Sequence, residues 1–60
     1  MSKIIFAAYT FASFITLTMK SGQVVRGYIT EIDNDGWLTI QDGGYHYFHE
    51  SEIKTAEVAE

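Results

Sequence analysis

Apolar and polar side chains alternate along short runs through most of the chain. In residues 14–19, Ile15, Leu17 and Met19 alternate with the side chains between them. Further runs, rich in β-branched and aromatic residues, occupy residues 24–32, 37–41, 45–49 and 53–58. Because successive side chains of a strand point to opposite faces, each run provides one apolar face. We therefore expect five short strands.

Clusters of polar residues and glycine separate these runs and predict tight turns. The clusters are residues 20–22, 33–36 and 42–44, which end in Ser-Gly, Asp-Gly and Gly-Gly. Such pairs supply the positive φ angles that hairpin turns require. Strands at this spacing, joined by such turns, indicate an antiparallel meander that forms a small barrel over residues 14–58. Gly27, midway along the longest run, suits a sharp bend or a bulge in its strand.

Residues 1–13 allow two interpretations. Ile4, Ile5 and Ala8 are spaced as on one face of a helix, whereas every second residue from Ile5 onward also suits a strand. We expect a short N-terminal helix or an extended arm that packs on the barrel. Both parts then belong to one domain, residues 1–60.

The uncharged stretch from Ile4 to Met19 faintly resembles a signal peptide. It contains several Ser, Thr and Tyr residues, however, and it is shorter than a membrane span. We therefore expect a cytoplasmic protein without a membrane partner.

The composition favours self-association. The chain has only 60 residues, is 47% apolar and contains no cysteine. A domain of this size buries little surface alone, and neither a disulfide nor a thiolate metal site can stabilise it. Burial of the surplus apolar surface between identical subunits would complete the core.

The charge restricts the kinds of partner. Eight acidic residues outnumber four basic ones and give a formal net charge of −4. This excess argues against broad, non-specific phosphate binding, which requires clustered Lys and Arg. A local phosphate site stays open, because a ring of subunits would repeat each lysine around its axis.

Residues 17–33, LTMKSGQVVRGYITEID, resemble the first motif of the Sm-like proteins. The motif has apolar residues, two glycines and an aspartate at positions that match Leu17, Met19, Gly22, Val25, Gly27, Ile29, Ile32 and Asp33. The resemblance extends over residues 14–58 and is similar in style to the bacterial Hfq-like RNA chaperones. It implies an all-β fold, a five-stranded, strongly bent antiparallel Sm-like (SH3-like) barrel. The compact chain without long tails suggests a bacterial or phage source.

The resemblance also implies a homo-oligomeric ring that binds single-stranded RNA. In Sm-like rings the fourth strand of one subunit pairs with the fifth strand of the next. The implied subunit interface consists of Tyr45, Tyr47, Phe48, Ile53 and Val58. Bases would enter near the central pore and meet Asn34, Asp35, Trp37, His49 and Lys54.

The sequence departs from the family where RNA binding is decided. Sm-like proteins that bind uridine have an asparagine at the position of Trp37, and the second motif is replaced here by His49-Glu50-Ser51. A carboxylate at Glu50 disfavours a phosphate nearby. The alternative hypothesis is an Sm-fold interaction or structural module without RNA binding, for example an inhibitor of a nucleic-acid-binding protein partner.

Each candidate residue also has a purely structural interpretation. Trp37 would more readily pack against the barrel or a neighbouring subunit than stack on a base. Turn chemistry accounts for Asn34 and Asp35, and solvation accounts for Lys54. Tyrosines in the fourth strand would serve as stacking platforms or equally well as part of a subunit seam.

Enzyme chemistry is the least expected class. His46 and His49 lie three apart on a predicted strand, so they face opposite sides and do not suit one metal ion. No Ser-His-Asp set, paired-carboxylate cleft or phosphate-binding glycine loop can be assembled. We therefore expect no catalytic residues, no metal and no cofactor.

Overall fold

The computed structural model describes residues 3–59, which form one short helix followed by five strands. The elements are α1 (Lys3–Thr10), β1 (Phe14–Met19), β2 (Val24–Ile32), β3 (Trp37–Gln41), β4 (Tyr45–His49), the 3-10 turn η1 (Glu50–Glu52) and β5 (Ile53–Val58). The five predicted strands and the all-β class are confirmed. Of the two interpretations of the N-terminal segment, the helix is correct from Lys3 onward; residues 1 and 2 lie outside the described residues.

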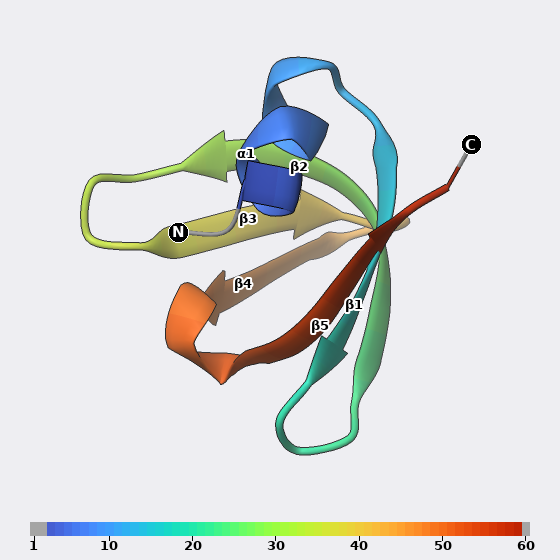
Figure 1. Cartoon of the computed structure of the whole chain (residues 1–60), viewed down its shortest axis with the longest axis vertical. Helices are drawn as coiled ribbons and strands as arrows, with labels where there is room; N and C mark the ends of the chain where they lie inside the picture. The colour runs from blue at the N-terminus through green and yellow to red at the C-terminus, as the bar shows by residue number, and fades with distance from the viewer. Residues whose placement is uncertain (1–2, 60) are drawn as a thin grey trace.

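The strands form one antiparallel sheet in the order β4-β3-β2-β1-β5. The sheet curls on itself, β2 bends sharply along its length, and α1 lies across the barrel (Figure 1). The two outermost strands are β4 and β5, and within residues 3–59 no ladder of backbone hydrogen bonds joins them. The barrel is therefore open between these two edges.

The hydrophobic core comes from α1 and the three central strands. The buried side chains of this core are Ile5, Ala8, Ile15, Leu17, Met19, Val25, Ile29, Leu38 and Ile40. On β4 and β5, Phe48 and Ile53 pack against this core but stay half-buried. The core is thus less well covered on the side of the open edges.

Helix α1 covers one end of the barrel and then stops abruptly. It contacts β2 and β5 and contributes Ile5 and Ala8 to the core. Ala12 has a φ of 51°, and the N–H of Ser13 donates to the carbonyl of Ala8 at 2.9 Å. A left-handed residue with this hydrogen bond is a standard helix end, so the chain turns directly into β1. Within residues 3–59 no helix has the length and apolarity needed to cross a membrane.

Gly27 is required because the backbone of β3 comes very close to it. A Cβ atom at this position would collide with the backbone carbonyl of Gln41 and touch the side chain of Ile40. Gly27 pairs with Ile15 on β1, whereas the following residue, Tyr28, pairs with Gln41. The irregularity in the β2–β3 ladder lies between Ile29 and Glu31. Gly27 is therefore needed for the close approach of the β3 backbone, and the bulge lies two residues or more after it.

We expect Gly27→Ala to lower the free energy of unfolding by about 2–3 kcal/mol, because the added methyl group overpacks a site closed by rigid backbone. Urea unfolding at one fixed protein concentration measures this change. Gly44→Ala is the matched control, since nothing lies within 4 Å of its Cβ position. Equal stability of the two variants would contradict the role of Gly27.

Candidate functional site

The loop between β2 and β3 is built around the carboxylate of Asp33. Its Oδ1 accepts hydrogen bonds from the N–H of Asp35 at 2.9 Å and from the N–H of Trp37 at 3.0 Å. The N–H of Asp33 also donates to the carbonyl of Trp37 at 3.0 Å. Gly36 has a φ of 91°, a conformation that favours glycine. The loop is therefore fixed at both ends by the aspartate that matches the Sm-like motif.

Trp37 begins β3 and forms an aromatic cluster with two side chains of β4. Its ring stacks on that of Tyr47, with the centroids 4.9 Å apart and the planes 8° from parallel. The ring of His49 meets it edge-on, at 5.0 Å and 76°. Trp37 lies directly across the ladder from His49, so all three side chains project from the same face of the sheet.

Hydrogen bonds to its own chain fix the ring of His49. Nε2 lies 2.9 Å from the carbonyl oxygen of Asp35, and Nδ1 lies 2.8 Å from Oγ of Ser51. The N–H of Ser51 also donates to Nδ1 at 3.2 Å. Because a carbonyl can only accept, this pattern assigns the proton to Nε2. His49 thus connects η1 to the β2–β3 loop, and both of its nitrogens are occupied.

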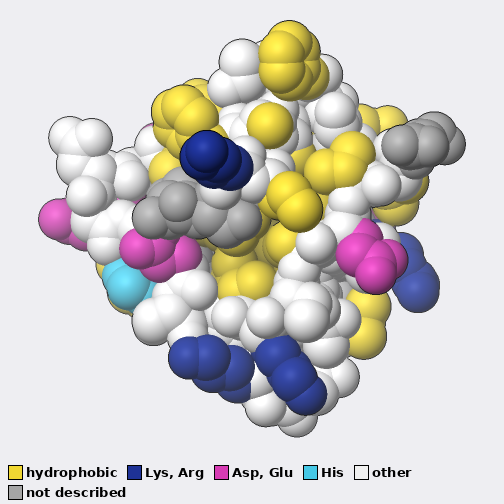
Figure 2. Space-filling model, viewed as in Figure 1, with side chains coloured by type: hydrophobic (Ala, Val, Ile, Leu, Met, Phe, Trp, Pro, Cys, Tyr) yellow, Lys and Arg dark blue, Asp and Glu magenta, His cyan; other side chains and the backbone are white. Residues whose placement is uncertain are grey.

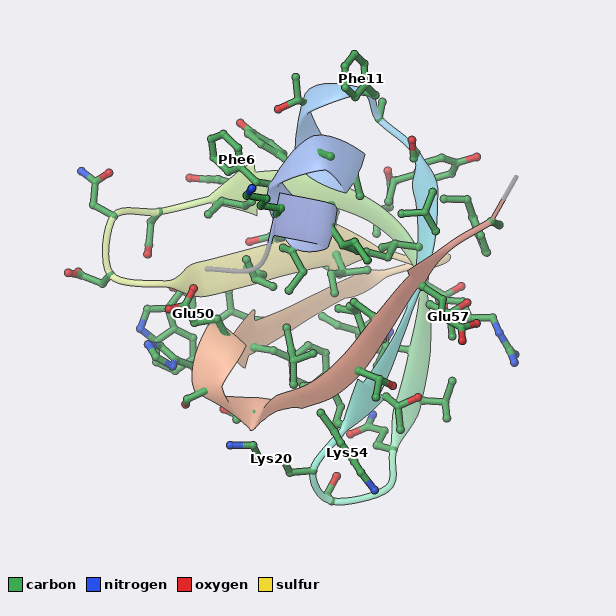
Figure 3. The ribbon with its side chains drawn as sticks, viewed as in Figure 1. Phe6, Phe11, Lys20, Glu50, Lys54 and Glu57 are labelled. Atoms are coloured by element: carbon green, nitrogen blue, oxygen red, sulfur yellow. The ribbon has the colours of Figure 1, made fainter. Side chains whose placement is uncertain are left out.

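The structure brings together only some of the residues expected at an RNA site. Asp35, Trp37 and His49 lie in contact, and Asn34 is exposed at the tip of the same loop. Lys54 does not join them: Figure 3 places it at the end of the molecule near Lys20, away from the loop that Figure 1 shows between β2 and β3. Within one subunit, Lys54 therefore does not lie beside the aromatic cluster.

The residues expected at a subunit interface lie on the two open edges. Tyr45, Tyr47 and Phe48 belong to β4, and Ile53 and Val58 belong to β5. The two tyrosines and Val58 are exposed, whereas Phe48 and Ile53 are half-buried. This placement is compatible with the expected seam and does not test it.

A groove of about 360 Å³ runs between α1, η1 and β5. Its walls are Ile5, Glu50, Ser51, Ile53, Lys54, Thr55 and Ala56. Oε2 of Glu50 is buried and has no hydrogen-bond partner among the described residues. The side chain of Glu50 lies over Gly36, where a Cβ atom would come within 2.9 Å of the carboxyl carbon. Position 36 thus favours glycine for two reasons: its positive φ angle, and the Glu50 side chain that fills the space where a Cβ atom would lie.

The described residues offer little else for chemistry. Within residues 3–59 no three His, Cys, Asp or Glu side chains are grouped closely enough to hold a metal ion. In Figure 2 some Lys and Arg side chains lie next to each other at the bottom of the view and the others lie apart, and no basic stripe crosses this face. His46 points away from His49 and stacks on Phe48 at 6.1 Å.

Two contacts in the cluster were not predicted from the sequence. Tyr47 was expected at a subunit seam or as a stacking platform, and its ring stacks on Trp37, a contact that tests neither role. Ser51 was not expected to contribute, yet it holds Nδ1 of His49. The sequence did contain one signal for this cluster. Tyr47 and His49 are two residues apart on a predicted strand, so they share one face, and an aromatic residue on the neighbouring strand, such as Trp37, would contact both.

No protein-family model and no curated protein matches the chain. Among solved structures it is similar to the crystal structure at 1.55 Å of Hfq, described as a pleiotropic translational regulator. The two structures superimpose with a TM-score of 0.81 over 95% of this chain and 86% of the other, at 21% sequence identity. The chain therefore has the Sm-like fold, in the form found in Hfq.

Proposed function

We propose that this chain is a subunit of a homo-oligomeric Sm-like ring that binds single-stranded RNA. The observation that supports RNA binding most directly is the ordered aromatic cluster of Trp37, Tyr47 and His49 on an accessible sheet face. Aromatic side chains on which bases stack are the usual way in which a sheet binds single strands. The Sm-like fold supports the ring.

The backbone of β4 supports self-assembly. The N–H of Glu50 donates to the carbonyl of Gly36, and the N–H of Asp42 donates to the carbonyl of Gly44, each at 2.8 Å. In an antiparallel ladder, hydrogen-bonded residue pairs alternate with pairs that are not hydrogen-bonded. Gly44 and Glu50 belong to hydrogen-bonded pairs, and Tyr45 and Tyr47 lie an odd number of residues from both. The N–H and C=O groups of these two tyrosines therefore face away from β3.

The same argument applies to β5. The N–H of Ala59 donates to the carbonyl of Phe14 at 3.0 Å. Because hydrogen-bonded and non-hydrogen-bonded pairs alternate along the β1–β5 ladder, the N–H and C=O groups of Ala56 and Val58 face away from β1. Two edges with free donors and acceptors invite strand pairing, and pairing each β4 with the β5 of the next subunit removes every edge in a closed ring.

Antiparallel pairing across this seam would complete the RNA site. It places the C-terminal end of β4, with His49, beside the N-terminal end of a neighbouring β5, with Lys54. The lysine that is distant within one subunit would then lie near the aromatic cluster of the next. The five residues expected to bind RNA come together only in this arrangement.

A second function has specific support from the charge. The chain has a net charge of −4, and Glu50 is one of the residues that line the groove between α1, η1 and β5. Such a surface would suit a basic protein partner better than a phosphate backbone. The alternative is thus an Sm-fold ring that binds a protein and no RNA.

Fluorescence anisotropy with labelled U-rich and A-rich oligonucleotides distinguishes these functions. We expect the protein to bind at low salt and to lose affinity as salt rises, because phosphate contacts release counterions. Trp37→Ala should weaken binding by up to about 1–3 kcal/mol, the value of one base–aromatic stack, because it takes apart the aromatic cluster.

Phe11→Ala is the control for that experiment, since Phe11 is 78% exposed and lies at the far end of α1 in Figure 3. It should leave the affinity unchanged. If the wild-type protein binds neither oligonucleotide at low salt, RNA binding is wrong and the protein-binding alternative stands.

Tyr45→Pro tests the seam. It removes an N–H that faces away from β3, at the first residue of a strand, where proline is tolerated. On dilution, the variant assembly should dissociate while the protein concentration is still higher than that at which the wild type dissociates. The reason is that one backbone hydrogen bond is lost at every seam of the ring. Light scattering coupled to gel filtration measures the mass on dilution.

The control variant is Tyr45→Ala, which removes the ring but keeps the backbone N–H. It should assemble more stably than Tyr45→Pro. An unchanged mass for Tyr45→Pro at all concentrations would mean that β4 does not form the seam.

A further inference from the structure

We propose that Tyr47 is the residue on which a nucleobase stacks, and that Trp37 and His49 are positioning residues that hold its ring. This inference rests on the proposed RNA binding and identifies the contact within that site. It assigns the side chain of Tyr47 to the ligand and leaves only its backbone groups to the proposed subunit seam.

The geometry of the cluster leaves Tyr47 as the accessible ring. Tyr47 is 63% exposed, whereas Trp37 is half-buried. One face of the Trp37 ring is covered by Tyr47, and His49 packs against Trp37 at nearly a right angle. An incoming base therefore meets the outer face of Tyr47 first.

Tyr47 is also held in place before any ligand arrives. Its ring lies parallel to that of Trp37, and Trp37 is supported by His49, whose two nitrogens are bound to Asp35 and Ser51. A side chain that is already ordered loses less conformational entropy on binding. Tyr45 provides the contrast: it is 71% exposed on the same strand and face, and no ring packs against it among the described residues.

The neighbouring charges indicate how a strand of RNA would lie. In the ladder Tyr47 is opposite Thr39, and Thr39 is opposite Glu31, which is exposed on β2. The carboxylate of Glu31 would repel a phosphate on that side. The base would thus stack on Tyr47 with its backbone toward the free edge of β4, where a neighbouring subunit's Lys54 is proposed to lie.

The test compares variants of Tyr47 with the same labelled oligonucleotides, after binding by the wild-type protein has been measured. Tyr47→Thr removes the ring and keeps a β-branched residue that suits a strand. Tyr47→Phe keeps the ring and removes the hydroxyl. Phe11→Ala, at an exposed position outside β4 and β5, is the control. For each variant the mass of the assembly is measured at the concentrations of the titration.

We expect Tyr47→Thr to weaken binding about tenfold or more, since it removes a stacking partner. Tyr47→Phe and Phe11→Ala should bind like the wild type, and all three should keep the wild-type mass. The Phe variant guards against a folding defect. If Tyr47→Phe binds like the wild type while Tyr47→Thr does not, binding requires the ring of residue 47 and not its hydroxyl.

Two results with a binding wild type would overturn the inference while leaving RNA binding in place. If Trp37 is the platform, Tyr47→Thr uncovers its face and binds as well as the wild type or more tightly. If Tyr47 belongs to the seam, Tyr47→Thr lowers the mass of the assembly. A wild-type protein that binds no oligonucleotide overturns both this inference and the proposed function.

Discussion

The close approach of the Gly27 backbone to the carbonyl of Gln41 is the constraint on which the fold depends. Without a side chain at this point, β2 bends sharply and serves both halves of the barrel (Figure 1). The bend brings Leu38 and Ile40 of β3 over Ile15 and Leu17 of β1, so that one core forms within so short a chain. A flat sheet of this length would expose its apolar face.

The same bend leaves the sheet open between β4 and β5. These strands contribute half-buried side chains, such as Phe48 and Ile53, and among residues 3–59 no further strand pairs with their outer edges. A small domain without disulfides gains stability most readily by burying such a region against copies of itself. The fold, its incomplete core and the proposed ring thus have a common physical origin in the curvature of one strand.

The fold was predictable because its signals are local. Alternation along residues 14–19 and glycines in the turns define strands and connections without knowledge of distant contacts. The site was predictable only in part, because its geometry depends on pairing between strands. The stack of Tyr47 on Trp37 requires the register of β3 and β4, and the bond from Ser51 to His49 requires the turn η1. The alternation along β4 puts Tyr47 and His49 on one face, but nothing in the sequence specifies which residue of β3 lies opposite them.

The mass of the wild-type protein in solution tests the central claim most directly. Light scattering coupled to gel filtration, over a wide range of concentrations, should give a constant mass that is a whole multiple of the 6.8 kDa chain. A closed ring keeps that mass until it dissociates on dilution, because every edge is paired. A folded protein that elutes as a 6.8 kDa monomer at every concentration would contradict the account. Masses that grow continuously with concentration would also contradict it, because they indicate open-ended pairing of edges.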